Sequence, residues 1–277
     1  MRILTICPYR LLPLRGGGAL RCFHLLRQLA RFHEVHAIVF QREEELRRET
    51  DGYKVPDNVR IYSPLDTPPP RTLFDRLPRR LGPGLHYRWM RRSWRGPAES
   101  TLLRCHHLLR EVLARQEVDV MVFEHLSTMA ASPVARRVSP AAVQCLDAHN
   151  VDHRLLAQEI DGQPNERMSR NRRRSLATTE WTERHLGRFV HGFCACSDDD
   201  RRVLEACSGL AGYTVPNGVD TAFFAFDANP TKATSKCLLY SGWMGTRANQ
   251  DGIAYFAEDI WPLILEQRPD LDRKSVV

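Results

Sequence analysis

Carboxylate and imidazole side chains cluster directly after two short apolar segments, Val118–Phe123 and Val143–Leu146, which we expect to be strands of a parallel sheet. The polar residues are Glu124 and His125 after the first segment, and Asp147, His149 and Asn150 after the second. Open parallel sheets bind ligands beyond the carboxyl ends of their strands. A single histidine there is more often structural, but two such strand ends favour a site. We predict that His149 donates or accepts a hydrogen bond to a substrate hydroxyl and that Asp147 orients it.

Three consecutive glycines, Gly16, Gly17 and Gly18, lie between a predicted first strand at Ile3–Cys7 and a predicted helix at Ala19–Phe32. A backbone without Cβ atoms can approach phosphate oxygens, and a helix N-terminus supplies N–H donors and the positive end of its dipole. The spacing differs from the G-x-G-x-x-G pattern of dinucleotide-binding proteins. The glycine run indicates either a phosphate-binding loop or a flexible surface loop.

Apolar segments alternate with amphipathic ones along most of the chain, which predicts an α/β fold with a doubly wound, Rossmann-like parallel sheet. The other predicted elements are strands at Glu34–Phe40, Val59–Tyr62 and Phe193–Cys196, and helices at Ser100–Gln116, Arg167–Phe189 and from Ser197 onward. Ser197 is a favourable N-cap. The three aspartates after it suit the first turn of a helix, so they need no metal to explain them.

We predict a first domain at 1–226, a polar linker at 227–235 and the start of a second domain at 236–277. Asn217 and Gly218 favour a tight turn, or a hinge because the linker is near. The second domain begins with a strand at Lys236–Ser241 that turns at Gly242, followed by a helix at Gln250–Glu266. The last residues, Asp272–Val277, lack an apolar strand pattern. One strand and one helix cannot bury both faces of a sheet, so we expect this domain to be incomplete.

The composition is that of a soluble globular protein, with 43% hydrophobic and 26% charged residues among 277 and a net charge of +7. No apolar stretch is long enough to cross a bilayer and no signal peptide is evident, so we expect a cytoplasmic protein. The positive charge comes without a nucleic-acid motif, so we expect no nucleic-acid partner. The 8 cysteines lack metal-ligand spacing, so we interpret them as small buried residues and expect no metal.

Prolines, tryptophans and arginines are interleaved from Ser63 to Gly96. This segment either packs its aromatic side chains on the first domain or contacts anionic lipid headgroups at the inner face of the membrane.

In this order, these features resemble the family 4 glycosyltransferases, which have the GT-B architecture of two facing Rossmann-like domains. The matching segments are Ile3–Pro8 with Gly16–Gly18, Val118–His125, Leu146–Asn150, Cys196–Ser197, Val215–Asp220 with Phe224, and Leu239–Met244 with Asn249. The resemblance covers nearly the whole chain. It implies a retaining transferase that moves a sugar from a nucleotide-sugar donor to a glycan or lipid-linked acceptor, in cell-surface polysaccharide synthesis, without a metal or other cofactor.

The resemblance also implies a role for each candidate residue. His149 is expected near the transferred sugar, with Asp147 beside it. Gly16, Gly17, Gly18, Gly242 and Arg247 are expected at the donor diphosphate, and Glu124, His125 and Asn150 on the acceptor side.

The family's Glu-x7-Glu motif departs from this pattern, because it lies late in the donor domain. Glu258 and Glu266 have that spacing but lie in the first helix of the second domain, so we interpret the match as accidental. We therefore expect a truncated and inactive transferase that keeps the acceptor half of the site. Two alternatives are a non-catalytic acceptor-binding or scaffold module and a nucleotide-processing enzyme such as an epimerase.

Overall fold

The computed structural model describes residues 1–67, 99–161, 166–225, 237–242, 244–245 and 247–276. The chain consists of two compact units, Met1–Gly218 and Val219–Val277. Most of the segment rich in proline, tryptophan and arginine and the whole predicted linker lie outside the described residues.

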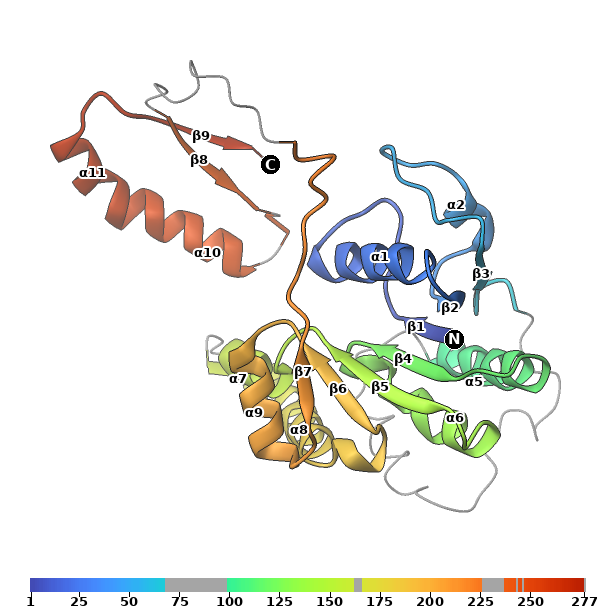
Figure 1. Ribbon diagram of the computed structural model, residues 1–277. Coiled ribbons are helices and arrows are strands. Elements are labelled where there is room, and N and C mark those ends of the chain that lie inside the picture. Colours follow the sequence, from blue (N-terminus) through green and yellow to red (C-terminus); the bar gives the residue numbers. More distant parts are fainter. Residues whose placement is uncertain (68–98, 162–165, 226–236, 243, 246, 277) are drawn as a thin grey trace. The chain divides into compact units, whose positions relative to one another are not determined.

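The first unit is built on a seven-stranded parallel sheet in the order β3-β2-β1-β4-β5-β6-β7 (Figure 1). The strands are β1 (Arg2–Cys7), β2 (Glu34–Val39), β3 (Val59–Tyr62), β4 (Val120–Glu124), β5 (Val143–Ala148), β6 (Gly192–Ala195) and β7 (Gly212–Thr214). The six strands predicted for this unit are confirmed with ends within two residues, and β7 is additional.

Helices connect the strands. They are α1 (Gly17–Leu29), α2 (Glu43–Arg47), α5 (Glu99–Arg115), α6 (Ser132–Val138), α7 (Asp152–Asp161), α8 (Glu166–Arg184) and α9 (Asp198–Ser208), with short 3-10 turns η1 (Leu126–Ala131) and η2 (Leu186–Arg188). Helix α9 begins as predicted, because the Ser197 side chain accepts a hydrogen bond from the Asp200 N–H at 3.1 Å. Helix α7 has no counterpart in the sequence prediction.

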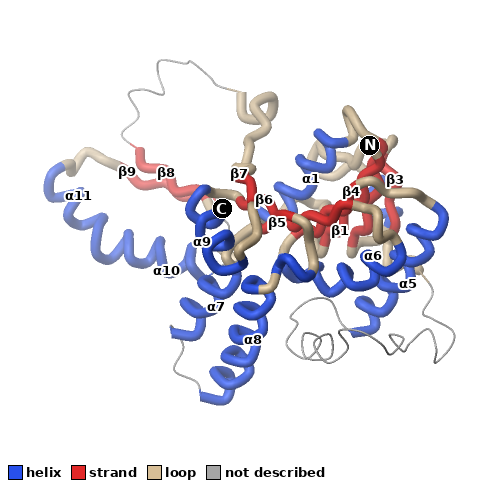
Figure 2. Tube along the Cα trace, turned by 60° about the horizontal axis from the view of Figure 1, so that its bottom comes forward, coloured by secondary structure: helices blue, strands red, loops and turns tan. Residues whose placement is uncertain are grey.

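Two hydrophobic cores cover the two faces of the sheet. Leu4 of β1 packs in one core with Leu109 of α5, whereas Cys7 packs in the other with Phe23 of α1. Successive side chains of a strand point to opposite faces, so helices on both sides bury both sets. Figure 2 shows α1 on one side of the strands and α5 and α6 on the other. The predicted doubly wound α/β arrangement is therefore confirmed.

The second unit contains the parallel pair β8 (Cys237–Ser241) and β9 (Asp272–Val276). Between them run α10 (Arg247–Tyr255), the short π-helix η4 (Phe256–Ile260) and α11 (Trp261–Gln267). Asp272–Val276 forms a strand although the sequence has no apolar strand pattern there. The ladder uses backbone groups, so β9 pairs with β8 although its side chains are mostly polar.

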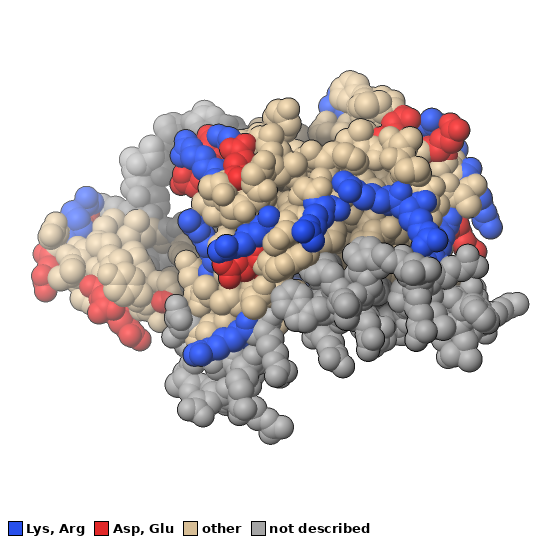
Figure 3. All heavy atoms as spheres, turned by 90° about the horizontal axis from the view of Figure 1, so that it is seen from below, with Lys and Arg blue, Asp and Glu red and all other residues tan. Residues whose placement is uncertain are grey.

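Charge is unevenly distributed over the described surface. Figure 3 shows Lys and Arg side chains in a stripe along one face. Exposed arginines on the helices and turns of the first unit include Arg115, Arg137, Arg184 and Arg188. Within the described residues, no helix combines the length and apolar character needed to cross a bilayer.

Candidate functional site

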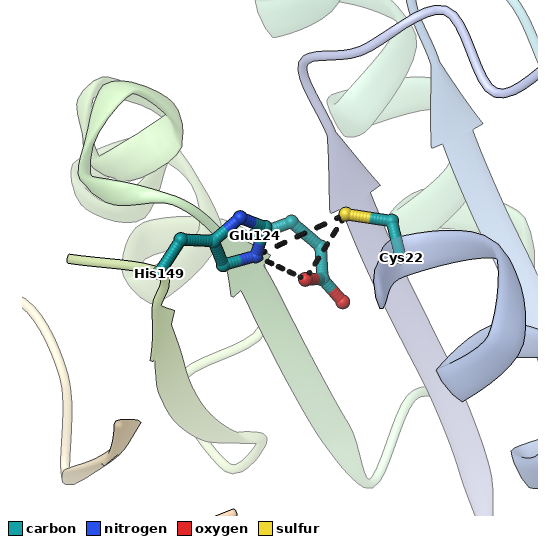
Figure 4. A group of neighbouring side chains, drawn as sticks. All are labelled: Cys22, Glu124 and His149. Atoms are coloured by element: carbon teal, nitrogen blue, oxygen red, sulfur yellow. Dashed lines mark hydrogen bonds and ion pairs between the residues drawn. The ribbon is translucent and has the colours of Figure 1, made fainter. Parts of the chain in front are cut away.

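The predicted polar residues of β4 and β5 meet at the carboxyl edge of the sheet. Glu124 is the last residue of β4 and lies opposite Asp147 of β5 in the strand register. His149 follows directly after β5 and its ring turns back toward Glu124 and helix α1 (Figure 4). The structure thus brings together Glu124, Asp147 and His149.

The imidazole of His149 is enclosed on three sides. Its Nε2 lies 3.3 Å from Oε2 of Glu124 and 3.5 Å from Oδ2 of Asp147. Its Nδ1 lies 3.3 Å from the Tyr9 hydroxyl, and the two rings stack with an interplanar angle of 14°. Only 6% of the His149 side chain is exposed. The ring is therefore fixed in orientation by groups from three different segments.

Arg21 of α1 balances the charge of Asp147. Its Nε and Nη2 each donate to a carboxylate oxygen of Asp147 at 2.7 Å, and Nη1 donates to Oδ1 of Asn217 at 3.0 Å. Both charged side chains are 4% exposed. A bidentate arginine–carboxylate pair is among the strongest hydrogen-bonded pairs in proteins. Arg21 therefore joins α1, β5 and the segment after β7.

Cys22, the next residue of α1, closes the other side of Glu124. Its thiol donates to Oε2 of Glu124 at 3.3 Å and lies 4.0 Å from Nε2 of His149. The ligand atoms of Cys22, Glu124 and His149 all lie within 4.8 Å of one another. Among the described residues, this is the one group of three or more such side chains close enough to share a metal ion.

Burial and pairing shift the pKa values at the site in opposite directions. Burial raises the pKa of Glu124. Burial opposes ionisation of Asp147 and of His149 as well, but hydrogen bonds with their charged neighbours outweigh it. The pKa of Asp147 falls to about 2, and the pKa of His149 rises to about 9. At neutral pH, His149 is therefore an imidazolium that donates from both ring nitrogens.

The glycine run forms the N-terminal end of α1 beside this cluster. Gly16 has φ +81, a conformation that suits glycine, and a Cβ at Gly16 or Gly17 meets no described heavy atom within 4 Å. A Cβ at Gly18 would lie 2.6 Å from Cζ of Tyr9. Gly16 and Gly17 therefore leave open space at the helix N-terminus, whereas Gly18 makes room for the Tyr9 ring.

Of the remaining predicted residues, His125 lies beside His149, with 5.9 Å between the two ring centroids. His125 has φ 70, its Nδ1 accepts from the Ser127 N–H at 3.1 Å, and its Nε2 lies 3.4 Å from Asp152. Asn150 is exposed. Asn217 is linked to the site by the hydrogen bond that it accepts from Arg21, and Gly218 is the last residue of the first unit. Gly242 and Arg247 belong to the second unit, after β8 and at the start of α10.

Three residues that the sequence prediction missed complete the cluster: Tyr9, Arg21 and Cys22. The sequence could have indicated Arg21, because this residue lies among Ala19, Cys22 and Phe23, which are buried in α1. A charged residue on a buried helix face needs a partner, and Asp147 is one of the two carboxylates predicted at the strand ends. Tyr9 carried no such signal, since its position follows from the path of the loop after β1.

The chain resembles known proteins in sequence profile and in fold. A profile of the family described as Glycosyltransferase Family 4 matches residues 15–223. No curated protein sequence matches the chain. Sucrose-phosphate synthase from Thermosynechococcus elongatus is 11% identical, with a TM-score of 0.50 over 99% of this chain and 70% of that one. This likeness shows a common fold.

Two further solved structures have lower TM-scores. The N-terminal domain of Candida albicans trehalose-6-phosphate phosphatase is 16% identical, with a TM-score of 0.48 over 99% of this chain and 64% of that one. UDP-GlcNAc 2-epimerase from Neisseria meningitidis, bound to UDP-GlcNAc, is 13% identical, with a TM-score of 0.46 over 99% and 65%. The chain thus spans between 64% and 70% of the length of these three structures.

Proposed function

The chain belongs to glycosyltransferase family 4, and on that premise we propose that it transfers a sugar from a nucleotide-sugar donor to a glycan or lipid-linked acceptor with retention of anomeric configuration. The observation that carries this proposal is the buried imidazole of His149, held between Glu124 and Asp147 at the carboxyl edge of the sheet. Ligands of such sheets bind at this edge.

His149 is the residue that we place at the transferred sugar. Because its pKa is about 9, the ring donates hydrogen bonds at neutral pH and does not act as a base. Its 3.3 Å contact with the Tyr9 hydroxyl is longer than the usual hydrogen bond, so a substrate oxygen can replace that contact at small cost. The positive ring also stabilises negative charge that develops on the departing diphosphate. Asp147 acts as a positioning residue for His149.

The open N-terminal end of α1 is the place that we assign to the donor diphosphate. The backbone N–H groups of the first turn point out of a helix toward such an anion, and Gly16 and Gly17 leave the approach clear. We place the acceptor nearer His125 and Asn150, and Glu124 influences that side through His149. Gly242 and Arg247 remain predicted donor contacts of the second unit.

The acceptor of this proposal is attached to a lipid or a glycan at the inner face of the membrane. The stripe of Lys and Arg in Figure 3 suits a surface of anionic headgroups. Vesicle co-sedimentation with anionic and with neutral lipid tests this part separately. Equal sedimentation with both lipids would remove the membrane from the proposal.

Titration calorimetry of the purified chain with UDP, GDP and the corresponding sugar nucleotides tests the donor assignment. The Gly17→Glu and Gly17→Gln variants form a matched pair, since both side chains enter open space and differ in one charge. If the diphosphate lies against this loop, the Glu variant binds about tenfold more weakly than the Gln variant, a difference of about 1.4 kcal/mol. Equal affinities would place the diphosphate elsewhere.

Product analysis tests the reaction itself. In a version of the chain extended to carry a full donor domain, we expect transfer to continue in excess chelator, to fall strongly in His149→Ala, and to give a product with the donor's anomeric configuration by NMR. Inversion would refute retention. If no nucleotide binds and no sugar is transferred, the transferase proposal fails, and a non-catalytic acceptor-binding module is the remaining interpretation.

A further inference from the structure

We propose that Cys22, Glu124 and His149 form a binding site for a soft divalent transition-metal ion such as Zn²⁺. The three side chains come from α1, from the end of β4 and from the residue after β5, and Figure 4 shows their ligand atoms converging. Ligands from three separate segments, brought together by the fold, form a built site and not a chance surface cluster.

The spacing of the ligand atoms fits a tetrahedral ion. With usual zinc bond lengths to sulfur, nitrogen and oxygen, the edges of the tetrahedron are about 3.3–3.6 Å. The observed separations are 3.3 Å from Sγ of Cys22 to Oε2 of Glu124, 3.3 Å from that oxygen to Nε2 of His149, and 4.0 Å from Nε2 to Sγ. Only the last separation has to shorten. Three protein ligands leave the fourth corner of the tetrahedron to another group, such as water.

The surroundings of His149 match those of a metal-ligating histidine. Such a ring is usually oriented by a hydrogen bond from its other nitrogen, and here Nδ1 contacts the Tyr9 hydroxyl. The Glu124 and His149 side chains are 3% and 6% exposed, so little water competes for them. Arg21 neutralises Asp147, so the charges of a Cys22 thiolate and a Glu124 carboxylate together balance a divalent ion.

The chemistry of the ligands selects the ion. One sulfur, one imidazole nitrogen and one carboxylate oxygen suit Zn²⁺ or Co²⁺, whereas Mg²⁺ and Ca²⁺ prefer shells of oxygen. On binding, the Cys22 thiol and Nε2 of His149 each lose a proton to solvent, and the ion takes the position of the proton on Nε2. An occupied site is then inhibitory, and this consequence, unlike the binding itself, rests on the proposed function.

Titration of the tag-free full chain with Co²⁺ tests the site without any sugar nucleotide, so its outcome is independent of transferase activity. A thiolate ligand gives Co²⁺ a charge-transfer absorption in the near ultraviolet, and Zn²⁺ should displace the cobalt and abolish the band. Mg²⁺ should leave the band unchanged. We expect Cys22→Ser, which keeps a hydroxyl donor toward Glu124, to lose the band and to bind Zn²⁺ at least about 100-fold more weakly, since even outer-shell partners contribute 10–100-fold.

The matched control is Cys207→Ser, because Cys207 is a half-buried thiol of α9 that donates to the Leu204 carbonyl at 3.4 Å. This variant should retain the full band. Glu124→Gln should keep the band but weaken binding, and circular dichroism checks that each variant is folded. The proposal is overturned if the band is absent from the unaltered chain at a roughly 100-fold excess of cobalt, or if it persists unchanged in Cys22→Ser.

Discussion

Four ionisable side chains of the site, Arg21, Glu124, Asp147 and His149, are each less than one tenth exposed. Water screens such charges poorly, so each depends on its neighbours for its charge state. Arg21 makes the shortest of these contacts and reaches both Asp147 and Asn217. We expect a substitution of any of these four residues to change both the free energy of unfolding and the pKa values of the others.

Two substitutions of Arg21 distinguish the loss of its charge from the loss of its hydrogen-bond geometry. Arg21→Ala leaves Asp147 buried without its main partner, so we expect a loss of about 3–5 kcal/mol in the free energy of unfolding. Arg21→Lys keeps the charge but cannot make the bidentate pair and the Asn217 contact together, so its loss should be smaller. Urea unfolding measures both. Arg48→Ala, which breaks an exposed pair with Glu44, serves as the control and should cost less than about 0.5 kcal/mol.

The raised pKa of His149 predicts a pH dependence of stability. Folding favours the protonated ring, so the stabilisation is fully present below pH 6.5 and disappears as the pH rises through about 9. The full difference corresponds to about 3 kcal/mol. Glu183, whose pKa burial raises to about 8, also lowers stability as pH rises, so the comparison of the unaltered chain with His149→Gln isolates the histidine.

An NMR titration of the His149 ring gives its pKa directly. A value near 6.5 would contradict the paired geometry. The His33→Gln variant, outside the site, should reproduce the pH profile of the unaltered chain.

At the scale of elements, α1 carries two glycines that differ sharply in what they tolerate. Gly18→Ala puts a Cβ 2.6 Å from the Tyr9 ring, so the ring must leave its stack on His149. We expect a loss of about 1–3 kcal/mol and a changed His149 pKa. Gly17→Ala enters open space on the same helix and should be neutral or stabilising by up to about 1 kcal/mol. Thermal unfolding compares the two variants, and an equal loss in both would mean that the Tyr9 ring does not limit Gly18.

Elements with a strong local pattern could be predicted from the sequence, and those that depend on distant partners could not. Apolar runs predicted β1 to β6, and the side chain of Ser197 predicted the start of α9. Helix α7 is polar, and its first turn is held by Glu183 of α8, whose carboxylate accepts from the Asp152 N–H at 2.8 Å. Strand β9 forms because β8 offers a ladder. Neither partnership is visible in the local sequence.

The residues of the site also divide into those that the sequence could predict and those that it could not. The positions of Glu124, Asp147 and His149 follow from a simple rule about strand ends, so they could be predicted. Tyr9 and Cys22 reach His149 through the path of a loop and the rotation of a helix, which no spacing in the sequence determines. Ligand contacts assigned by resemblance stay predictions at every position.

For the whole molecule, the predicted resemblance to family 4 and the Rossmann-like α/β fold are confirmed. Among the described residues, those that contact His149, and Asn217 beyond them, belong to the first unit. We therefore expect a chain ending at Gly218 to keep a His149 pKa near 9 by NMR titration. A return to about 6.5 would show that residues after Gly218 are needed to build the site.

The contacts of Arg21 can form only after residues much later in the chain have been synthesised. Asp147 and Asn217 follow it by 126 and 196 positions in the chain. At about 10 residues per second, a ribosome delivers them roughly 13 and 20 s after Arg21. Until β4 is made, β1 also lacks one of its two neighbours in the sheet. The nascent chain thus lacks both folded-state partners of Arg21 and one neighbour of β1 for many seconds. Codon choice between residues 21 and 147 should therefore change the yield of folded protein without changing its sequence.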